Sequence, residues 1–212
     1  SAISRLPQES IVLDKGKVLM RAPSSEAVDF YLNRGLSKMG ERFWEEDEIP
    51  AISAPFKPLA IRLVDKDGRV SDSVRSIDPV MVEIEYELTE DITGLRVGYY
   101  LFTTRGEPIF TSFDTDSEEL FREFTSRPKG VYASRCVIPA HTLNEGRFVL
   151  GVNASSYRIK RYFQDDQALS FSVDASGAAG TQWPEPRPGA VRPALEWKIE
   201  ERQRQAADKA KY

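Results

Sequence analysis

The chain has few of the residues that build metal centres and disulfide bonds. Its 212 residues include one cysteine, Cys136, and one histidine, His141. A single cysteine forms no intrachain disulfide, and one cysteine with one histidine gives too few ligands for zinc. We therefore expect no metal site, and the cysteine usage fits a reducing compartment.

Long apolar runs and an excess of positive charge are missing too. The longest apolar runs, such as residues 97–102, fall far short of the roughly 20 residues that cross a bilayer. The 29 basic residues are outnumbered by 33 acidic ones, and the formal net charge is −4. Because a basic surface drives binding to DNA and RNA, nucleic acid is not an expected partner.

Enzyme motifs are scarce. The chain contains neither G-x-x-x-x-G-K-[ST] nor G-x-G-x-x-G, two common phosphate-binding loops. His141 lies in "PAHTLNEG" without a serine or cysteine motif, and an isolated loop histidine is usually structural or solvated. "DKDG" at 65–68 and "DTDSEE" at 114–119 resemble parts of calcium loops, but a hairpin turn and a helix N-cap are simpler interpretations. No catalytic residue is predicted.

Strand periodicity, by contrast, is abundant. In "VMVEIEYEL", residues 80–88, apolar side chains alternate with glutamates, which predicts an antiparallel strand with one buried face. Similar patterns occur at 60–65, 95–102, 108–113, 131–139, 147–155 and 168–173. Turns such as Asp67-Gly68 separate these segments, and most have no helix between them. The sequence therefore predicts an all-β fold, an antiparallel β-sandwich.

The N-terminal region has a different character. "SIVLD" and "KVLMR" flank Lys15-Gly16 and predict a short hairpin. Ser24 or Ser25 then caps a predicted amphipathic helix. Residues 36–57, which contain an acidic run and prolines, predict a linker. So small a hairpin and helix bury no core of their own, which indicates a piece of a larger domain.

The C-terminal region predicts a flexible arm followed by one more strand. Residues 176–189 are too rich in glycine and proline to be regular. A last strand is predicted at about 189–199, and residues 200–212 form a polar tail. Four apolar side chains of this strand are in phase: Val191, Leu195, Trp197 and Ile199. Because a proline interrupts it, an edge or bulged position is expected.

Three glutamates share the outer face of the strand at 80–88. Glu83 and Glu85, or Glu85 and Glu87, would lie about 6.5 to 7 Å apart, within the carboxylate range of glycosidases. Alternating glutamates are also a common way to solvate a strand face. We favour the solvated face, and the hydrolase stays a less likely alternative.

A second outer face carries aromatic and polar side chains. If Val97, Tyr99 and Leu101 are buried, Tyr100 and Phe102 point outward, and Asn153 does so on its own strand. "SSYRIKRYF" at 155–163 adds Tyr157, Arg158 and Arg161. Flat rings bind the C–H face of a sugar, while Asn, Glu and Arg bind its hydroxyl or acidic groups. Candidate glycan ligands are therefore Glu83, Glu85, Tyr100, Phe102, Asn153, Tyr157, Arg158 and Arg161. Cover for a second sheet or a dimer contact is an equally good interpretation of the aromatics.

"IVLDKGKVLMRAPSSEAVDFYL", residues 11–32, resembles the closing segment of ATP-binding-cassette nucleotide-binding domains. In that family an "LxxGKV" hairpin leads into a helix that ends in a tyrosine. The resemblance implies that the phosphate loop and the water-orienting acid lie upstream of Ser1. ATP and Mg²⁺ would bind there, and no cofactor is expected in this fragment.

The order of the remaining segments resembles the C-terminal extension of Wzt-type subunits, the ATP-binding partners of O-antigen polysaccharide exporters. The matching segments are "LRVGYYLFTTRGEPIF", "IPAHTLNEGRFVLGV" and the final "RPGAVRP" followed by a tryptophan. The resemblance implies a jelly-roll or immunoglobulin-like carbohydrate-binding module that recognises the modified non-reducing end of the glycan. It also implies a homodimer that exchanges its last strand, a transmembrane permease partner, and a cytoplasmic location at the inner membrane.

The resemblance divides the chain into four parts: an ATPase remnant at 1–35, a linker at 36–57, the sandwich at 58–199 and a tail at 200–212. Two functions from different classes remain open beside the hydrolase. The sandwich either reads the glycan, or it dimerises the ATPase and has no ligand of its own.

Overall fold

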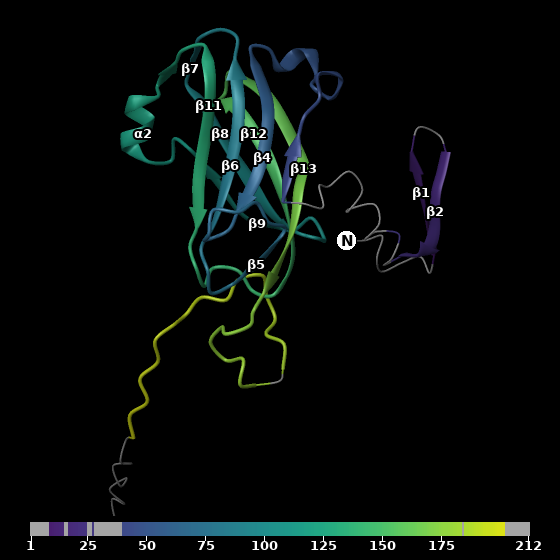
Figure 1. The fold of residues 1–212 in the computed structure, drawn as a ribbon, viewed down its shortest axis with the longest axis vertical. Coiled ribbons are helices and arrows are strands. Elements are labelled where there is room, and N and C mark those ends of the chain that lie inside the picture. The colour runs from purple at the N-terminus through teal and green to yellow at the C-terminus, as the bar shows by residue number, and fades with distance from the viewer. Residues whose placement is uncertain (1–8, 15–16, 25–26, 28–39, 184, 202–212) are drawn as a thin grey trace, which may run out of the picture.

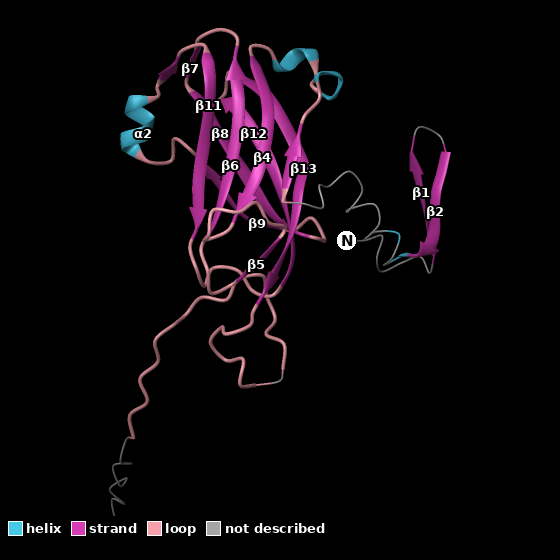
Figure 2. Cartoon of the chain, in the orientation of Figure 1, coloured by secondary structure: helices cyan, strands magenta, loops and turns pink. Residues whose placement is uncertain are grey.

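The main body of the chain is a pair of β-sheets packed face to face (Figure 1). The structure is a computed structural model that describes residues 9–14, 17–24, 27, 40–183 and 185–201. Helix is confined to short segments outside the sheets (Figure 2). The predicted all-β antiparallel sandwich is confirmed.

One sheet has four strands and the other has five. The four-stranded sheet, in the order β11-β6-β4-β3, comprises β3 Glu41–Phe43, β4 Phe56–Val64, β6 Val80–Leu88 and β11 Gly130–Ile138. The five-stranded sheet, in the order β5-β13-β12-β8-β9, comprises β5 Ser73–Arg75, β8 Leu95–Thr103, β9 Pro108–Phe113, β12 Gly146–Ser156 and β13 Lys160–Asp174. Neighbouring strands are antiparallel except β5 and β13, which are parallel.

The remaining elements lie outside these two sheets. They are β1 Glu9–Asp14, β2 Lys17–Pro23, β7 Ile92–Thr93, β10 Ser126–Arg127, the 3-10 turns η1 Glu46–Glu48 and η2 Ala51–Ser53, and helix α2 Glu118–Glu123. The hairpin of β1 and β2 was predicted, and it pairs with neither main sheet. The helix predicted after the cap at Ser24 or Ser25 lies almost entirely outside the described part of the chain, in which only Ser24 and Ala27 of this stretch are described, both as helical.

Strand β6 shows why the two sheets pack together. Its side chains alternate between buried and half-buried along the whole strand, as the sequence pattern predicts. The largest fully buried side chains come from both sheets: Tyr86, Phe56, Phe171, Ile61, Leu63, Leu88, Leu95, Leu101, Leu150 and Leu169. Burying each of them contributes about 1.5 to 3 kcal/mol, so the core lies between the sheets and leaves their outer faces for other roles.

The structure places strand β3 within the range that the sequence predicts as a linker. Trp44 directly follows β3 and is buried against Phe163, with ring centroids 5.4 Å apart. Its indole N–H donates to Asp165 at 3.1 Å. A strand of three residues is too short to show a period of two, which explains why the pattern does not reveal it.

The arm predicted to be flexible is tied back onto the sandwich. Asn144 donates through its side chain to the carbonyl oxygens of Arg187 and Gly189, at 2.7 and 2.9 Å. The buried guanidinium of Arg192 donates to the carbonyl of Ala179 at 2.9 Å. Residues 193–201 then leave the body as an exposed, extended segment (Figure 1). The point at which the chain becomes free is therefore about Arg192.

Candidate functional site

The outer face of the five-stranded sheet is hollowed by a groove of about 290 Å³, the outer groove. It lies over β8, β12 and the first part of β13, together with the turn that joins β12 to β13. Its lining residues are Arg96, Tyr100, Asn153, Ser155, Ser156, Tyr157, Arg158, Ile159, Lys160 and Arg161. Such a shallow groove suits a polymer that touches the surface along part of its length.

Strand register brings these residues together. On the central strand β12, Gly151 lies opposite Tyr100, and Ser155 lies opposite Arg96. On its other side Ser155 lies opposite Arg161 of β13. Since neighbouring strands lie about 4.8 Å apart, the backbones of Arg96 and Arg161 are roughly 10 Å apart across the groove.

Two glycines in the five-stranded sheet allow close approach of neighbouring backbone. A Cβ atom on Gly98 would lie 2.1 Å from the carbonyl oxygen of Ser112, and one on Gly151 would lie 2.9 Å from that of Asp165. No side chain fits at either position without movement of the neighbouring strand. The glycines therefore allow close packing of β9 against β8 and of β13 against β12 in the sheet that carries the groove.

Aromatic rings and arginines form one continuous strip along this face. The ring of Tyr100 lies 5.9 Å from Phe102 and 6.4 Å from Phe113 between centroids. The guanidinium of Arg96 lies 4.4 Å from the centre of the Phe113 ring and 5.3 Å from that of Tyr157. Arg158 contacts the same Tyr157 ring at 5.1 Å. Stacked in this way, the arginines are held in place while their N–H groups stay available.

The outer groove is positively charged. Four cations line it, Arg96, Arg158, Lys160 and Arg161, and no aspartate or glutamate does. In the part of the chain that the structure describes, none of the four forms an ion pair. Lys160 donates instead to the carbonyl of Ala54 at 2.6 Å. The positive charge of the groove is therefore not balanced by acidic side chains of the described residues.

Two polar side chains lie beneath these cations. Asn153 is 3% exposed, and its side-chain oxygen accepts a hydrogen bond from the Ser155 hydroxyl at 3.0 Å. Ser155 in turn accepts from Nε of Arg96 at 3.1 Å. The Asn153 amide nitrogen donates to no other described residue. This chain of bonds orients Arg96 and leaves amide and guanidinium donors for a ligand.

The structure brings together five of the eight residues predicted to contact glycan. Tyr100, Asn153, Tyr157, Arg158 and Arg161 all line the outer groove. Phe102 lies beside it, against Tyr100. Their role in binding remains a prediction.

Glu83 and Glu85 lie elsewhere, on β6 of the four-stranded sheet. Both accept hydrogen bonds from Arg62, at 3.1 and 2.8 Å, and Glu83 also accepts from Arg135 at 2.6 Å. Burial opposes the charge of Glu83, but the hydrogen bonds from Arg135 and Arg62 lower the pKa of Glu83 below its ordinary value. Both carboxylates are therefore engaged in ion pairs with arginines of the same sheet, which fits the solvated, structural face that the sequence favours.

Sequence reasoning missed Arg96, Ser155 and Lys160 as groove residues. Arg96 has the same parity along β8 as Tyr100, so the alternation that selected Tyr100 could also have selected Arg96. Lys160 lies between two selected arginines in "RIKR". Phe113 carried no such signal, because its contact with Arg96 depends on the pairing of β9 with β8.

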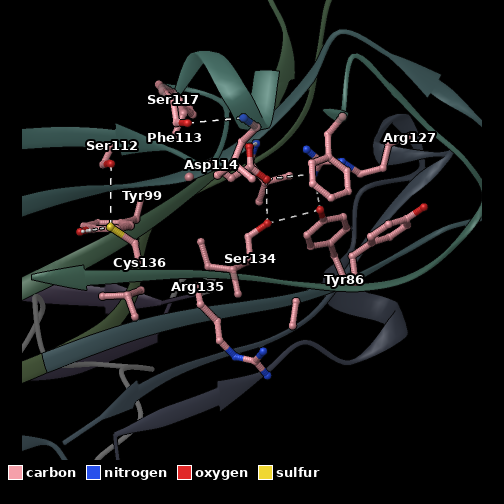
Figure 3. A pocket seen from close by; sticks show the side chains of 18 residues that line it. Tyr86, Tyr99, Ser112, Phe113, Asp114, Ser117, Arg127, Ser134, Arg135 and Cys136 are labelled. Atoms are coloured by element: carbon pink, nitrogen blue, oxygen red, sulfur yellow. Dashed lines mark hydrogen bonds and ion pairs between the residues drawn. The ribbon is translucent and has the colours of Figure 1, made fainter. Parts of the chain in front are cut away.

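A second hollow of about 380 Å³ lies between the sheets, where β9 and β11 form neighbouring edges (Figure 3). We call it the intersheet cavity. Its wall is largely apolar and includes Tyr86, Leu120, Phe124 and Tyr132. At its other end Tyr99 donates to the thiol of Cys136 at 3.5 Å, and burial raises the pKa of Tyr99.

The polar groups of the intersheet cavity bond mainly to one another. Asp114 accepts from Arg127 at 2.9 Å and from Ser134 at 2.7 Å, and Arg127 also donates to the hydroxyl of Tyr86 (Figure 3). Burial opposes the charge of Arg127, but attraction to Asp114 raises its pKa. Burial also raises the pKa of Tyr86. Nε of Arg127 is the buried exception, with no partner among the described residues. The network joins segments of both sheets, so its first role is structural.

The remaining candidate residues take simple roles. Asp65 accepts from the backbone N–H groups of Asp67 and Arg69, which closes the predicted Asp-Gly turn. Ser117 accepts from the backbone N–H of Leu120 and caps α2. His141 adopts a left-handed backbone conformation in a loop. Within the described residues, no group of three or more His, Cys, Asp or Glu side chains could hold a metal ion, and no helix is long and apolar enough to cross a membrane.

Comparison with known proteins gives one consistent result. The sequence profile of the Wzt C-terminal domain matches residues 59–183, more than half of the chain. Among solved structures, the crystal structure of the C-terminal domain of Wzt is similar, with a TM-score of 0.56 and 13% sequence identity. The match covers 81% of this chain and 96% of that one. At this identity the structural match shows the fold alone. No curated protein sequence matches the chain.

Proposed function

Because the chain belongs to the Wzt C-terminal domain family, we propose that it is a non-catalytic module that recognises the non-reducing end of O-antigen polysaccharide. The module would act on a cytoplasmic ATP-binding subunit at the inner membrane, whose partner is a transmembrane permease. ATP and Mg²⁺ would bind in the ATPase domain, whose closing segment residues 1–35 resemble.

The observation that carries this proposal is the outer groove. It combines exposed rings with unbonded guanidinium and amide donors, which is the combination that sugar rings and their hydroxyl groups require. The intersheet cavity is larger, but most of its polar groups already bond to one another. A ligand there would have to displace those bonds, whereas a ligand in the outer groove satisfies donors that lack partners.

The groove would work by holding the polymer near the pore. A shallow polar site gives modest affinity, because each hydrogen bond to the sugar replaces one to water. Retention nevertheless raises the effective concentration of the glycan beside the permease. Two grooves in a dimer would increase retention further if one polymer end can exchange between them.

The dimer would form through the exposed C-terminal segment. Leu195, Trp197 and Ile199 are 68, 85 and 97% exposed, an unfavourable state for large apolar side chains in water. Strand β11 is a sheet edge of nine residues with Val131 and Val137 exposed. An extended segment from a second copy would pair with that edge and cover apolar surface on both partners.

Glycan binding is tested by titrating capped and uncapped O-antigen oligosaccharides into the chain by calorimetry. Tyr100→Ala and Asn153→Ala should each weaken binding about tenfold while the unfolding temperature of Tyr100→Ala changes little. Tyr132→Ala, on the wall of the intersheet cavity, serves as the matched control and should bind normally. Loss of binding in Tyr132→Ala with normal binding in Tyr100→Ala would move the site to the cavity.

An assembly domain without a ligand is the competing function, and the exposed C-terminal segment favours it. Light scattering on a chain truncated after Pro193 should show a monomer where the full chain is a dimer. A full chain that dimerises but binds no oligosaccharide would support assembly alone. A truncated chain that remains a dimer would contradict strand exchange.

A further inference from the structure

The outer groove has a charge that a neutral sugar would leave unbalanced. Resting on the proposed function above, we infer that the glycan end held in this groove carries an anionic group, a phosphate or a carboxylate. The four cations of the groove come from three segments: β8, the turn after β12, and β13. The chain as a whole has a formal net charge of −4, so this local excess runs against its overall balance.

The like charges of the groove repel one another across the central strand β12. Arg96 and Arg161 flank Ser155 in register, and Lys160 is next to Arg161 in sequence. A bound anion would lower this repulsion and gain attraction from each cation. A neutral hydroxyl would gain hydrogen bonds but would leave the repulsion in place. The groove should therefore favour a charged ligand over its neutral counterpart.

Arg96 is the residue best prepared for an anion. Its guanidinium is fixed by stacking on Phe113 and Tyr157 and by the bond from Nε to Ser155. Its two terminal nitrogens form no hydrogen bond with the described residues. A guanidinium with a fixed plane and free terminal nitrogens matches the paired oxygens of a phosphate or a carboxylate. Little conformational entropy is lost on binding, because the side chain is already ordered.

The position of these groups favours a glycan end over an anionic membrane. In the turn after β12, Tyr157 is 62% exposed and Ile159 is 80% exposed, so both side chains are able to contact a flat surface. Arg96 and the 3% exposed Asn153 lie on strands β8 and β12 instead. Only a narrow group that enters the groove contacts Asn153, Arg96 and Arg161 together.

Matched ligands test the inference directly. The probes are glucose, glucose 6-phosphate and glucuronic acid, followed by O-antigen oligosaccharides with and without a terminal phosphate or uronic acid. Calorimetry on the full chain should show that the charged member of a pair binds at least about tenfold more tightly at low salt. The preference should shrink as sodium chloride is added. The separate phosphate and carboxylate arms identify which anion is preferred.

Charge-removing variants supply the control. Arg161→Gln and Arg158→Gln should each reduce the ratio between charged and neutral affinity several-fold. Arg147→Gln removes an exposed arginine of β12 that lies outside the groove, and it should leave the ratio unchanged. Equal loss in all three variants would mean that only the net charge matters, and would overturn a site for an anion.

The other outcomes separate this inference from the proposed function. Equal affinity for charged and neutral oligosaccharides would overturn the anionic ligand and leave glycan recognition standing. No binding of either kind would overturn both. Binding to phosphatidylcholine vesicles only when they contain phosphatidylserine, without binding of charged oligosaccharides, would assign the groove to a membrane surface.

Discussion

The outer faces of the two sheets both carry charged side chains and use them in opposite ways. On the four-stranded sheet, Arg62 forms ion pairs with Glu41, Glu83 and Glu85, and Arg135 pairs with Glu83. On the five-stranded sheet, the cations of the outer groove have no carboxylate partner among the described residues. The charges on the four-stranded sheet are balanced by ion pairs within the chain, and we call this surface the completed face. The charges of the outer groove are left for a ligand to balance. Charge that the chain leaves unpaired is therefore a better guide to a binding face than the amount of charge.

The largest expected effect concerns the shape of the five-stranded face. Gly98→Ala should destabilise the chain by about 3 kcal/mol, because its Cβ would overlap the backbone of β9. Glu87→Ala, on the four-stranded sheet, should change stability by less than about 0.5 kcal/mol. Urea unfolding curves of both variants give the comparison. Equal stabilities would show that the five-stranded sheet does not depend on close strand packing at Gly98.

The next effect tests the completed face. Arg62→Gln should cost about 1.5 kcal/mol, because it leaves Glu41, Glu83 and Glu85 close together without their shared cation. Its affinity for glycan should be normal. Arg69→Gln, in an exposed turn, is the control and should unfold like the original chain. A weakened affinity in Arg62→Gln would mean that the two faces are coupled.

Acid should weaken the ion pairs on the outer face of the four-stranded sheet. The pKa of Glu83 is lowered in the folded chain, so its ionised form stabilises folding above the ordinary glutamate pKa. That contribution, about 1 kcal/mol or less, is lost as the pH falls through the lowered pKa. Chemical denaturation from pH 6 to pH 3, roughly the window of this titration, should show a smaller loss for Glu83→Gln. Identical pH slopes would contradict the lowered pKa.

The smallest expected effect is on the stability of the unpaired face. Arg161→Gln should change the free energy of unfolding by less than about 0.5 kcal/mol, because Arg161 has no ion pair to lose. Relief of repulsion from Lys160 acts in the opposite, stabilising direction. Arg62→Gln on the four-stranded sheet should therefore reduce stability and leave binding normal. Arg161→Gln on the five-stranded sheet should reduce binding and leave stability almost unchanged. A large destabilisation by Arg161→Gln would remove this distinction.

Much of the fold follows from the sequence because burial on one side of a sheet imposes a period of two. Strands β6 and β8 are found within a residue of their predicted ends for this reason. The sequence pattern does not predict the three-residue strand β3 or the first part of β13, although the structure contains both. β3 is too short to show a period, and β13 begins in "KRYFQDDQ", where polar and apolar side chains do not alternate cleanly.

The candidate site was partly predictable for the same reason. Alternation along β8 shows that Tyr100 and Phe102 face outward, and Arg96 follows from the same rule. Alternation does not tell which sheet a strand joins, so Glu83 and Glu85 could not be separated from the Tyr100 group. That separation depends on pairing between segments far apart in the chain, which local pattern does not encode.

The hydrogen bonds that Asn144 and Arg192 donate to the C-terminal arm anchor the chain at about Arg192. Nine residues, 193–201, extend from this anchor. At about 3.3 Å per residue they reach about 30 Å. Trp197 is the fifth of these residues and reaches about 17 Å from Arg192. In the proposed dimer, the strand of the second copy that receives Trp197 must therefore lie within that distance of Arg192, which limits the spacing of the two subunits.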